Sequence, residues 1–331
     1  MAMDVCAIGE LLVEVMRPSP NVPLYQTGTF TGPYPSGAPA IFIDALARLG
    51  VATGMIGCVG NDDFGKCVLT RLVEDGVDVH QVATLQDKTT AVAFVTYFSA
   101  GARQFLFHVA DAAAGCIQVD QLDELVLAQT RVLHLNGSTL SINETTRLAC
   151  YEAARMVKQN GGIVTFDPNI RPELCEAGEM EQLYTPLLNM CDYVLPSDGE
   201  AELLTGQAQR EDAVRALLEL GAKAVICKHG AAGCTLYHGA GQVQVPAFHV
   251  DVVDPTGAGD CFSAGFVYGL LKEWDWEPIL TFANAMGALA TRKQGPMEGI
   301  GHLADVKAFI QQNVRQFGHR GWAHTKAPYY F

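Results

Sequence analysis

The chain has 331 residues, of which 49% are hydrophobic, enough for one large α/β domain or for two smaller domains. Its formal net charge of -14 argues against nucleic acid or an anionic membrane as a partner, because phosphate groups attract Lys and Arg. We expect a cytoplasmic protein, since the N-terminus lacks the pattern of a signal peptide and no apolar run approaches the roughly 20 residues of a membrane span.

Short strand-like and helix-like patterns alternate in the first part of the chain. The apolar run 5–9 predicts a buried parallel strand, and residues 40–49 have the periodicity of a helix. Residues 54–59 predict the next strand, and a polar turn then leads to a helix over 66–74. This order is typical of a parallel sheet that is covered by helices.

Two further β-rich runs, 91–98 and 103–109, predict a hairpin whose turn is 99–102. Together with residues 20–33 they can form a small separate sheet. Glu10 and Glu14 follow the first strand, where a carboxylate can bind substrate hydroxyls, although solvated loop acids are commoner.

Strand–helix alternation continues from residue 131 onward. The expected strands are 132–135, 162–166, 193–195 and 224–227, and the expected helices are 141–158, 179–190 and 199–204. Such alternation predicts βαβ units and a mostly parallel sheet with helices on both faces. Ligands of these folds bind at the carboxyl ends of the strands.

The stretch Asp254-Pro255-Thr256-Gly257-Ala258-Gly259-Asp260 precedes the apolar, helix-compatible run 261–271. Glycines let successive N–H groups converge, and a helix start adds unpaired donors and a positive dipole end, so the stretch predicts an anion site. A carboxylate at Asp260 repels an anion unless it takes a proton from a substrate hydroxyl, and the combination describes phosphoryl transfer to an alcohol. The alternative is an ordinary turn in which Asp260 stabilises the helix dipole.

Polar residues follow two other expected strands. Arg171 can hold a phosphate or sugar oxygen with Asn169 beside it, or these residues can form an Asx-Pro turn with a surface arginine. Glu200 can bind magnesium through water, or it can complete a capping box in which Ser197 is the helix N-cap.

Lys228, Gly230 and Gly233 follow the expected strand 224–227. The two glycines leave room for a flat adenine against the backbone, and Lys228 can approach nucleotide phosphates. A plain hairpin is the alternative. Asn284 lies in a run of small residues, which usually serves helix packing.

These motifs resemble those of the ribokinase-like (PfkB) carbohydrate kinases, and the resemblance extends from Gly9 to about Ala290. It implies a ribokinase-like three-layer α/β sandwich over residues 1–311, with a mostly parallel central sheet and a small β-sheet lid built from segments 20–33 and 91–110. The tail 312–331 has no counterpart in the family. A homodimer through the lid is the expected assembly.

The resemblance also implies ATP and magnesium as cofactors, with potassium as a further ion. Asp260 is then the general base, and the anion hole is formed by Gly257, Ala258 and Gly259. The sugar-binding residues would be Glu14, Gly37, Ala38, Arg103, Phe105, Arg171 and Asp260. The nucleotide-binding residues would be Asn169, Ser197, Lys228, Gly230, Gly233, Thr256, Gly257, Gly259 and Asn284. The metal-binding residues would be Glu200 for magnesium and Asp251 and Val253 for potassium.

Two departures from the family pattern concern the sugar. Ile41 stands where the family usually has a sugar-contacting Asn, and Val109 stands where 2-keto-3-deoxygluconate kinases have an Arg that meets the carboxylate. A buried carboxylate without a cation is costly, so we expect a neutral ketohexose such as tagatose or fructose. The run 32–44 also looks most like tagatose-type kinases.

Other functions stay open at this point. Within the family, the alternatives are a 2-keto-3-deoxygluconate kinase and a ribokinase. A catalytically silent nucleotide- or sugar-binding homologue is a third possibility, although an intact Asp260 argues against it. A dinucleotide-dependent oxidoreductase is disfavoured because no Gly-x-Gly-x-x-Gly follows the first strand.

Overall fold

The computed structural model describes residues 3–98, 103–175, 178 and 180–317. The predicted hairpin turn at 99–102 and the tail from residue 318 onward lie outside the described residues. Within the described part of the chain, no helix is both long and apolar enough to span a membrane.

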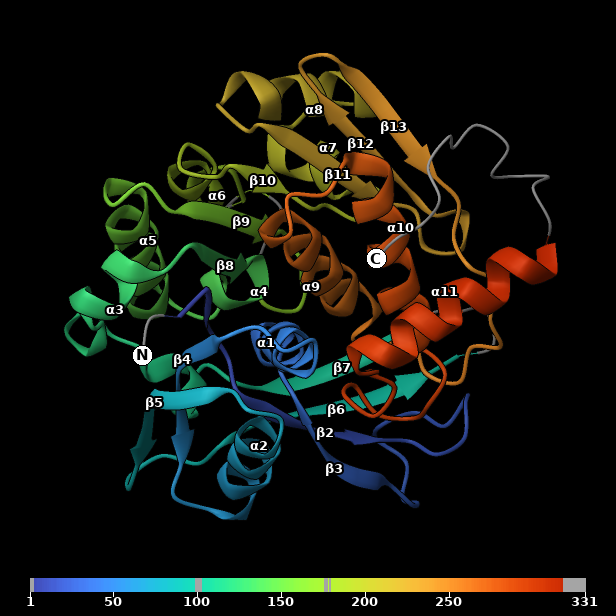
Figure 1. Ribbon diagram of the computed structural model, residues 1–331. Coiled ribbons are helices and arrows are strands. Elements are labelled where there is room, and N and C mark those ends of the chain that lie inside the picture. Colours follow the sequence, from blue (N-terminus) through green and yellow to red (C-terminus); the bar gives the residue numbers. More distant parts are fainter. Residues whose placement is uncertain (1–2, 99–102, 176–177, 179, 318–331) are drawn as a thin grey trace.

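A nine-stranded sheet forms the centre of the molecule, in the order β13-β12-β11-β10-β9-β8-β1-β4-β5 (Figure 1). Neighbouring strands are parallel except at the β13 end, where β11, β12 and β13 pair antiparallel. The strands are β1 Val5–Ile8, β4 Thr53–Gly60, β5 Asp78–Leu85, β8 Val132–Asn136, β9 Ile163–Asp167, β10 Tyr193–Val194, β11 Ala224–Lys228, β12 Cys234–His238 and β13 Gly241–Val245.

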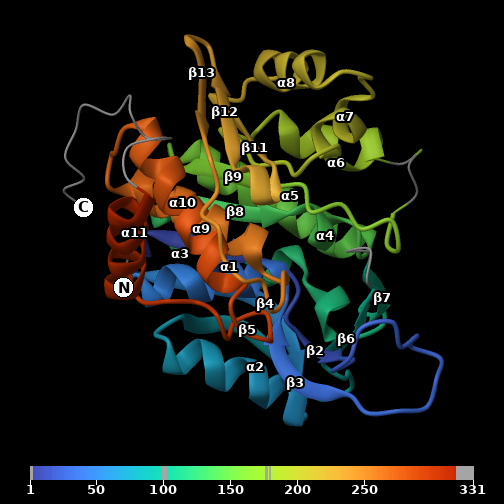
Figure 2. The same cartoon turned by 90° about the vertical axis from the view of Figure 1, so that its right-hand side faces the viewer.

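Helices cover both faces of this sheet and give three layers (Figures 1 and 2). Because alternate side chains of a strand point to opposite faces, Val5 and Ala7 of β1 enter one apolar core, whereas Cys6 and Ile8 enter the other. The first core is covered by α1 Ala38–Arg48, α2 Asp63–Glu74, α9 Ala258–Leu271, α10 Trp276–Ala290 and α11 Leu303–Phe317. The second is covered by α3 Glu124–Gln129, α4 Gly137–Leu140, α5 Glu144–Gln159, α6 Met180–Leu188, α7 Glu200–Thr205 and α8 Arg210–Glu219.

A separate four-stranded sheet, in the order β3-β2-β6-β7, is the lid. Its strands are β2 Leu12–Met16, β3 Thr31–Ser36, β6 Ala91–Tyr97 and β7 Arg103–His108. The chain enters it directly from β1 through Gly9, which has φ 155 and where a Cβ atom would collide with Pro39 and Thr139. The first strand of the large sheet is therefore joined to the lid by a very short, tightly packed connection.

The lid strands differ from the expected segments. The N-terminal lid strands are Leu12–Met16 and Thr31–Ser36, and residues 17–30 contain no strand. Pro33 and Pro35 argued against a strand at β3 in the sequence. However, β3 is an edge strand, where missing N–H groups are tolerated.

The helix expected over 141–158 is α5, and the separate short helix α4 precedes it. Ser141 is the C-cap of α4, and α5 starts after Asn143, whose side chain accepts a hydrogen bond from the Thr146 N–H. The Asn143 cap therefore places the start of α5 at Glu144, three residues later than expected. The helix expected over 261–271 begins earlier, at Ala258, so Asp260 lies in its first turn.

Candidate active site

Two adjoining cavities lie at the carboxyl ends of the central strands. The smaller lies under the lid, and the larger extends toward β11, the segment 247–252 and α10. Residues that line both cavities mark their junction, namely Arg103, Asn169, Arg171, Gly257 and Asp260. The larger cavity has a volume of about 630 Å³, in the range of ordinary ligand sites.

The anion loop, residues 254–260, forms the wall at this junction. Gly257 is the N-cap of α9 with φ 77, and a Cβ atom there would lie 2.6 Å from the Pro296 carbonyl oxygen, so the position needs glycine. The first N–H groups of α9 have no partner within the helix, and they and the dipole favour a negative ligand. The predicted turn into a helix start is therefore present, and the anion cradle stays a prediction.

Asp260 is 9% exposed, and no described residue donates a hydrogen bond to its carboxylate. Burial and the negative charge of Asp167 raise the pKa of Asp260 to about 7, against the opposing effect of Lys228. A carboxylate with a free oxygen and a pKa near neutrality is suited to accepting a proton.

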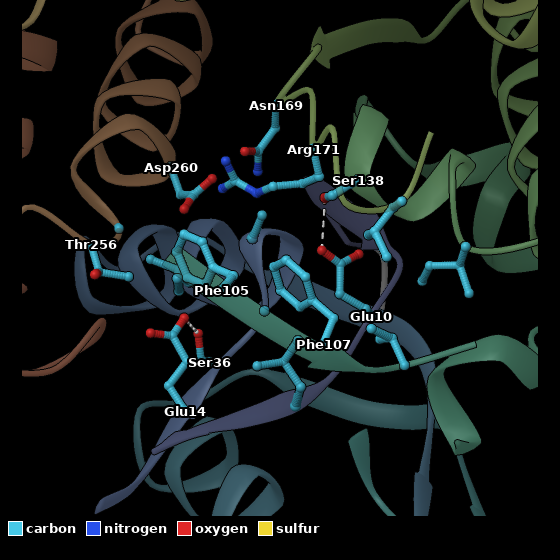
Figure 3. Close-up of a pocket in the computed structure, with 18 of the residues that line it drawn as sticks. Glu10, Glu14, Ser36, Phe105, Phe107, Ser138, Asn169, Arg171, Thr256 and Asp260 are labelled. Atoms are coloured by element: carbon cyan, nitrogen blue, oxygen red, sulfur yellow. Dashed lines mark hydrogen bonds between the residues drawn. The ribbon is translucent and has the colours of Figure 1, made fainter. Parts of the chain in front are cut away.

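The smaller cavity is acidic at its lid end. Glu14 of β2 accepts a hydrogen bond from the Ser36 hydroxyl at 2.7 Å, and its other oxygen, Oε2, is buried without a partner among the described residues (Figure 3). Glu10 accepts hydrogen bonds from the hydroxyls of Ser138 and Thr139. Burial raises the pKa of both glutamates, that of Glu14 to about 7.

Two arginines approach the junction from opposite sides of the cavity. Arg103 comes from the lid strand β7, Arg171 follows β9, and their guanidinium carbons lie 5.3 and 5.5 Å from the ring centre of Phe105. Desolvation and the charge of Arg171 lower the pKa of Arg103. Neither forms an ion pair within the described residues, and Figure 3 shows Arg171 pointing toward Asp260. The junction thus holds two cations that a transferred anion can use.

The remaining wall of the smaller cavity is apolar or made of backbone. Gly37 and Ala38 line it at the start of α1, and Val109 lines it beside the lid. Ile41, one turn into α1, also lines it, and its Cγ2 atom would lie 3.2 Å from a Cβ on Gly257. Ile41 therefore packs against the anion loop instead of offering a polar sugar contact.

Lys228 provides a third cation, at the floor of the larger cavity. Its ammonium lies 2.5 Å from the Asp167 carboxylate, which also accepts a hydrogen bond from Ser263 at 3.0 Å. A Cβ atom on Gly259 would lie 3.5 Å from this ammonium. This ion pair joins the ends of β9 and β11 and keeps the Lys228 ammonium beside the anion loop.

Glu200 is engaged by the backbone. Its two carboxylate oxygens accept the N–H groups of Ile170 and Ser197, both at 2.7 Å, and burial raises its pKa. The expected capping box is wrong in one respect, because α7 begins at Glu200 after Gly199 and the Ser197 side chain caps nothing there. Glu200 is not among the residues that line either cavity, whereas Ser197 lines the larger one.

The far end of the larger cavity has little side-chain bulk. Gly233 has φ 101, and Gly230 has φ 54. The Asn284 amide donates to the carbonyls of Val245 and Pro246 at 3.3 and 3.2 Å, which holds the segment after β13 beside the cavity. A flat apolar group has room between these glycines and α10.

The segment around Asp251 and Val253 lies at the rim of the larger cavity. Both residues are exposed, and the intervening Val252 lines the cavity. The Val253 N–H donates to the Thr291 carbonyl at 2.8 Å. This bond joins the segment to the loop that follows α10.

Most of the expected site residues come together in one place. Several residues that line the cavities or hold their walls were missing from the site residues that the family resemblance implied, although the sequence analysis had noted Glu10 as a carboxylate that can bind hydroxyls; they are Glu10, Ser36, Ser138, Asp167 and Asp254. Glu10 and Asp167 each stand at the carboxyl end of a strand, and that position was the available signal. Ser36 and Ser138 had no such signal in the sequence, because only their hydrogen bonds to Glu14 and Glu10 identify them as site residues.

Comparison with known proteins gives a consistent family. The profile described as pfkB family carbohydrate kinase matches residues 2–301. The chain is 32% identical to Fructokinase-1 of Zea mays over 323 residues, which cover 93% of this chain and 98% of that protein. It is 26% identical to 5-dehydro-2-deoxygluconokinase of Clostridium perfringens over 322 residues, which cover 95% of each protein.

Solved structures agree in fold. An E. coli protein provisionally named Ribokinase II, crystallised with ATP and Mg²⁺, superposes with a TM-score of 0.88 at 42% identity over 94% of this chain and 100% of that chain. A double mutant of Vibrio cholerae fructokinase, with fructose, ADP and a potassium ion bound, gives a TM-score of 0.79 at 26% identity over 93% of this chain and 99% of that chain. The predicted ribokinase-like α/β fold is therefore confirmed.

The raised pKa of Asp260 predicts a pH-dependent effect on stability. Between about pH 4, where an aspartate in the unfolded chain titrates, and about pH 7, the folded chain binds a proton that the unfolded chain does not, so stability falls as pH rises through this window. Asp260→Asn removes this loss of stability. In thermal unfolding, the Tm of the variant should therefore exceed that of the wild type by more at pH 8 than at pH 5.5. The exposed Asp87→Asn is the control, and an equal gain at both pH values would contradict the burial argument.

Proposed function

Because the chain belongs to the pfkB family of carbohydrate kinases and is a phosphotransferase that acts on a sugar hydroxyl, we propose that it transfers the γ-phosphoryl group of ATP to a terminal hydroxyl of a neutral ketohexose. Tagatose and fructose are the proposed sugars. The observation that carries this proposal is the set of charged side chains that line the smaller cavity, namely the buried Glu10 and Glu14 and, near Asp260, two arginines that form no ion pair within the described residues.

The larger cavity fits a nucleotide. Gly230 and Gly233 leave room for the base, and Lys228, Gly259 and the start of α9 face the position of the phosphates. Magnesium would neutralise phosphate charge when bound. Glu200, through water, is the proposed metal contact, and Asp167 lines the same cavity. Two relatives in the comparison were crystallised with adenine nucleotides, which supports ATP as the donor.

Different residues of the chain would accept the proton and bind the transferred phosphoryl group. Asp260 accepts the proton of the attacking hydroxyl, and its pKa of about 7 is matched to that task at neutral pH. Arg103, Arg171 and the anion loop hold the negative oxygens of the group in transit. Phe105 stacks with both guanidinium groups and keeps them at the junction.

The glutamates favour a neutral acceptor. The sugar end that is distant from Asp260 meets Glu10 and Glu14, and the unpartnered Glu14 Oε2 is a ready acceptor for a sugar hydroxyl. A substrate carboxylate at that end would face two acidic groups and the apolar Val109. This opposes a 2-keto-3-deoxygluconate kinase and supports a polyol.

A potassium ion is proposed near Asp251 and Val253, where the rim segment meets the loop after Thr291. The presence of potassium in the fructokinase crystal supports potassium as the ion. Backbone carbonyls of the two segments would supply most ligands, because the described residues contain no cluster of three or more metal-ligating side chains.

Asp260→Asn tests the general base. The variant keeps the size of the side chain but cannot accept the proton, so kcat should fall by about 10²–10⁴-fold. Binding of ATP and sugar, measured by calorimetry, should persist. In the wild type, kcat/KM should rise as pH passes about 7, and this rise should vanish in the variant. Near-normal turnover in Asp260→Asn would show that Asp260 is not the general base.

A sugar panel tests the acceptor. Coupled ADP-release assays should rank tagatose or fructose above ribose and 2-keto-3-deoxygluconate in kcat/KM. Glu14→Gln removes one negative charge, so it should raise KM for the preferred sugar while weakening the discrimination against the keto acid. A preference for the keto acid in the wild type would mean that Arg103 meets the carboxylate and that the neutral assignment fails.

A second copy of the chain is the proposed partner of the lid. The face of the lid turned away from the cavity carries Phe94 and Leu106, which are cross-strand neighbours, and Leu106 is 49% exposed on the edge strand β7. An open strand edge with an apolar neighbour favours pairing with another chain. Sedimentation should give a dimer that Leu106→Glu converts to a monomer, and a monomeric wild type at all concentrations would contradict this.

A further inference from the structure

A tyrosine of the lid is hydrogen-bonded to the anion loop. Tyr97 is the last residue of β6, and its hydroxyl donates to Asp254 Oδ1 at 2.8 Å. The same hydroxyl contacts the Thr256 hydroxyl. Since its proton goes to Asp254, its oxygen accepts from Thr256. A lid strand is thereby bonded to two residues of the loop that forms the anion cradle.

Asp254 is the centre of this contact. It is 2% exposed and accepts the Thr256 N–H at 3.0 Å and the Gly295 N–H at 2.9 Å in addition to the Tyr97 hydroxyl. Burial and the charge of Asp254 raise the pKa of Tyr97, so the phenol keeps its proton and stays a donor. One buried carboxylate therefore joins the lid, the anion loop and the loop after α10.

The strand register extends the effect to the junction. Tyr97 is paired with Arg103 on β7, and Val95 is paired with Phe105. Since β6 and β7 form one ladder, a shift of Tyr97 would also shift Arg103 and Phe105, which line the same cavity as Asp260. The Tyr97 hydroxyl touches neither of these side chains, so any effect on them is indirect.

We propose that Tyr97 and Asp254 form a latch that holds the lid on the anion loop and that Tyr97 is a positioning residue for Arg103. The latch itself follows from the hydrogen bonds alone. Its effect on turnover rests on the proposed function.

Hydrogen–deuterium exchange of the ligand-free protein tests the latch. Tyr97→Phe removes one hydroxyl that bonds to a buried charge, so exchange should speed up by about ten-fold or more in β6, β7 and residues 254–257. Tyr151→Phe is the matched control, because its hydroxyl donates to the Leu183 carbonyl, away from the site. Unchanged exchange in those segments, or faster exchange spread over the whole chain, would overturn the latch.

Kinetics of the same variants test the positioning role. Tyr97→Phe should lower kcat by about ten-fold or more with little change in KM for ATP, because it breaks a bond to a charged group that does not contact the nucleotide. In an Arg103→Ala background the same change should lower kcat less, since the residue it positions is gone. Equal losses in both backgrounds would overturn the positioning role. If the wild type phosphorylates no sugar in the panel, the proposed function fails and the exchange result alone judges the latch.

Discussion

The constraint on which this structure depends is the burial, at a helix start, of a carboxylate that accepts no hydrogen bond from any described residue. Asp260 lies in the first turn of α9, where backbone donors and two arginines attract anions, yet the side chain is itself anionic and nearly buried. Its ionisation is therefore balanced between the neighbouring charges of Asp167, which oppose it, and those of Lys228 and Arg171, which favour it. A site of this kind must be held by parts of the chain that are far apart in sequence.

Charge is distributed along the cavities in a definite order. Glu10 is held by the hydroxyls of Ser138 and Thr139, whereas Glu14 is held by Ser36 and keeps its Oε2 without a partner among the described residues. The cations gather at the junction and beside the anion loop, where Lys228 is paired with Asp167. In the proposed function, this arrangement would orient the acceptor, because the groups proposed to bind its hydroxyls differ from those proposed to bind phosphate.

The predictable parts of this protein are those with local causes. The turn at Gly257 needs glycine for its own φ and for its contact with Pro296, so the anion loop could be recognised from one stretch of sequence. Strand–helix alternation likewise predicted the parallel sheet. What the sequence did not reveal depends on distant partners or on position in the sheet. Ser36 could be identified as a site residue only from its hydrogen bond to Glu14. β3 is a strand despite two prolines because it lies at the edge of the sheet, where its outer N–H groups need no partner strand.

The anion loop shows how such distant partners act together. Its shape is held by Tyr97 of the lid, by the loop after α10 through Gly295 and Pro296, and by Ile41 of α1. The loop after α10 is held in turn by Arg71 of α2. Arg71 donates to the Met297 carbonyl of this loop at 2.7 Å and forms an ion pair with the buried Asp44 of α1. An apolar Ile41 is compatible with the proposed sugar site, because it packs beside Gly257 while the buried carboxylates of Glu10 and Glu14 line the same cavity. At this position the chain gives up a polar side chain and gains a contact that supports the anion loop.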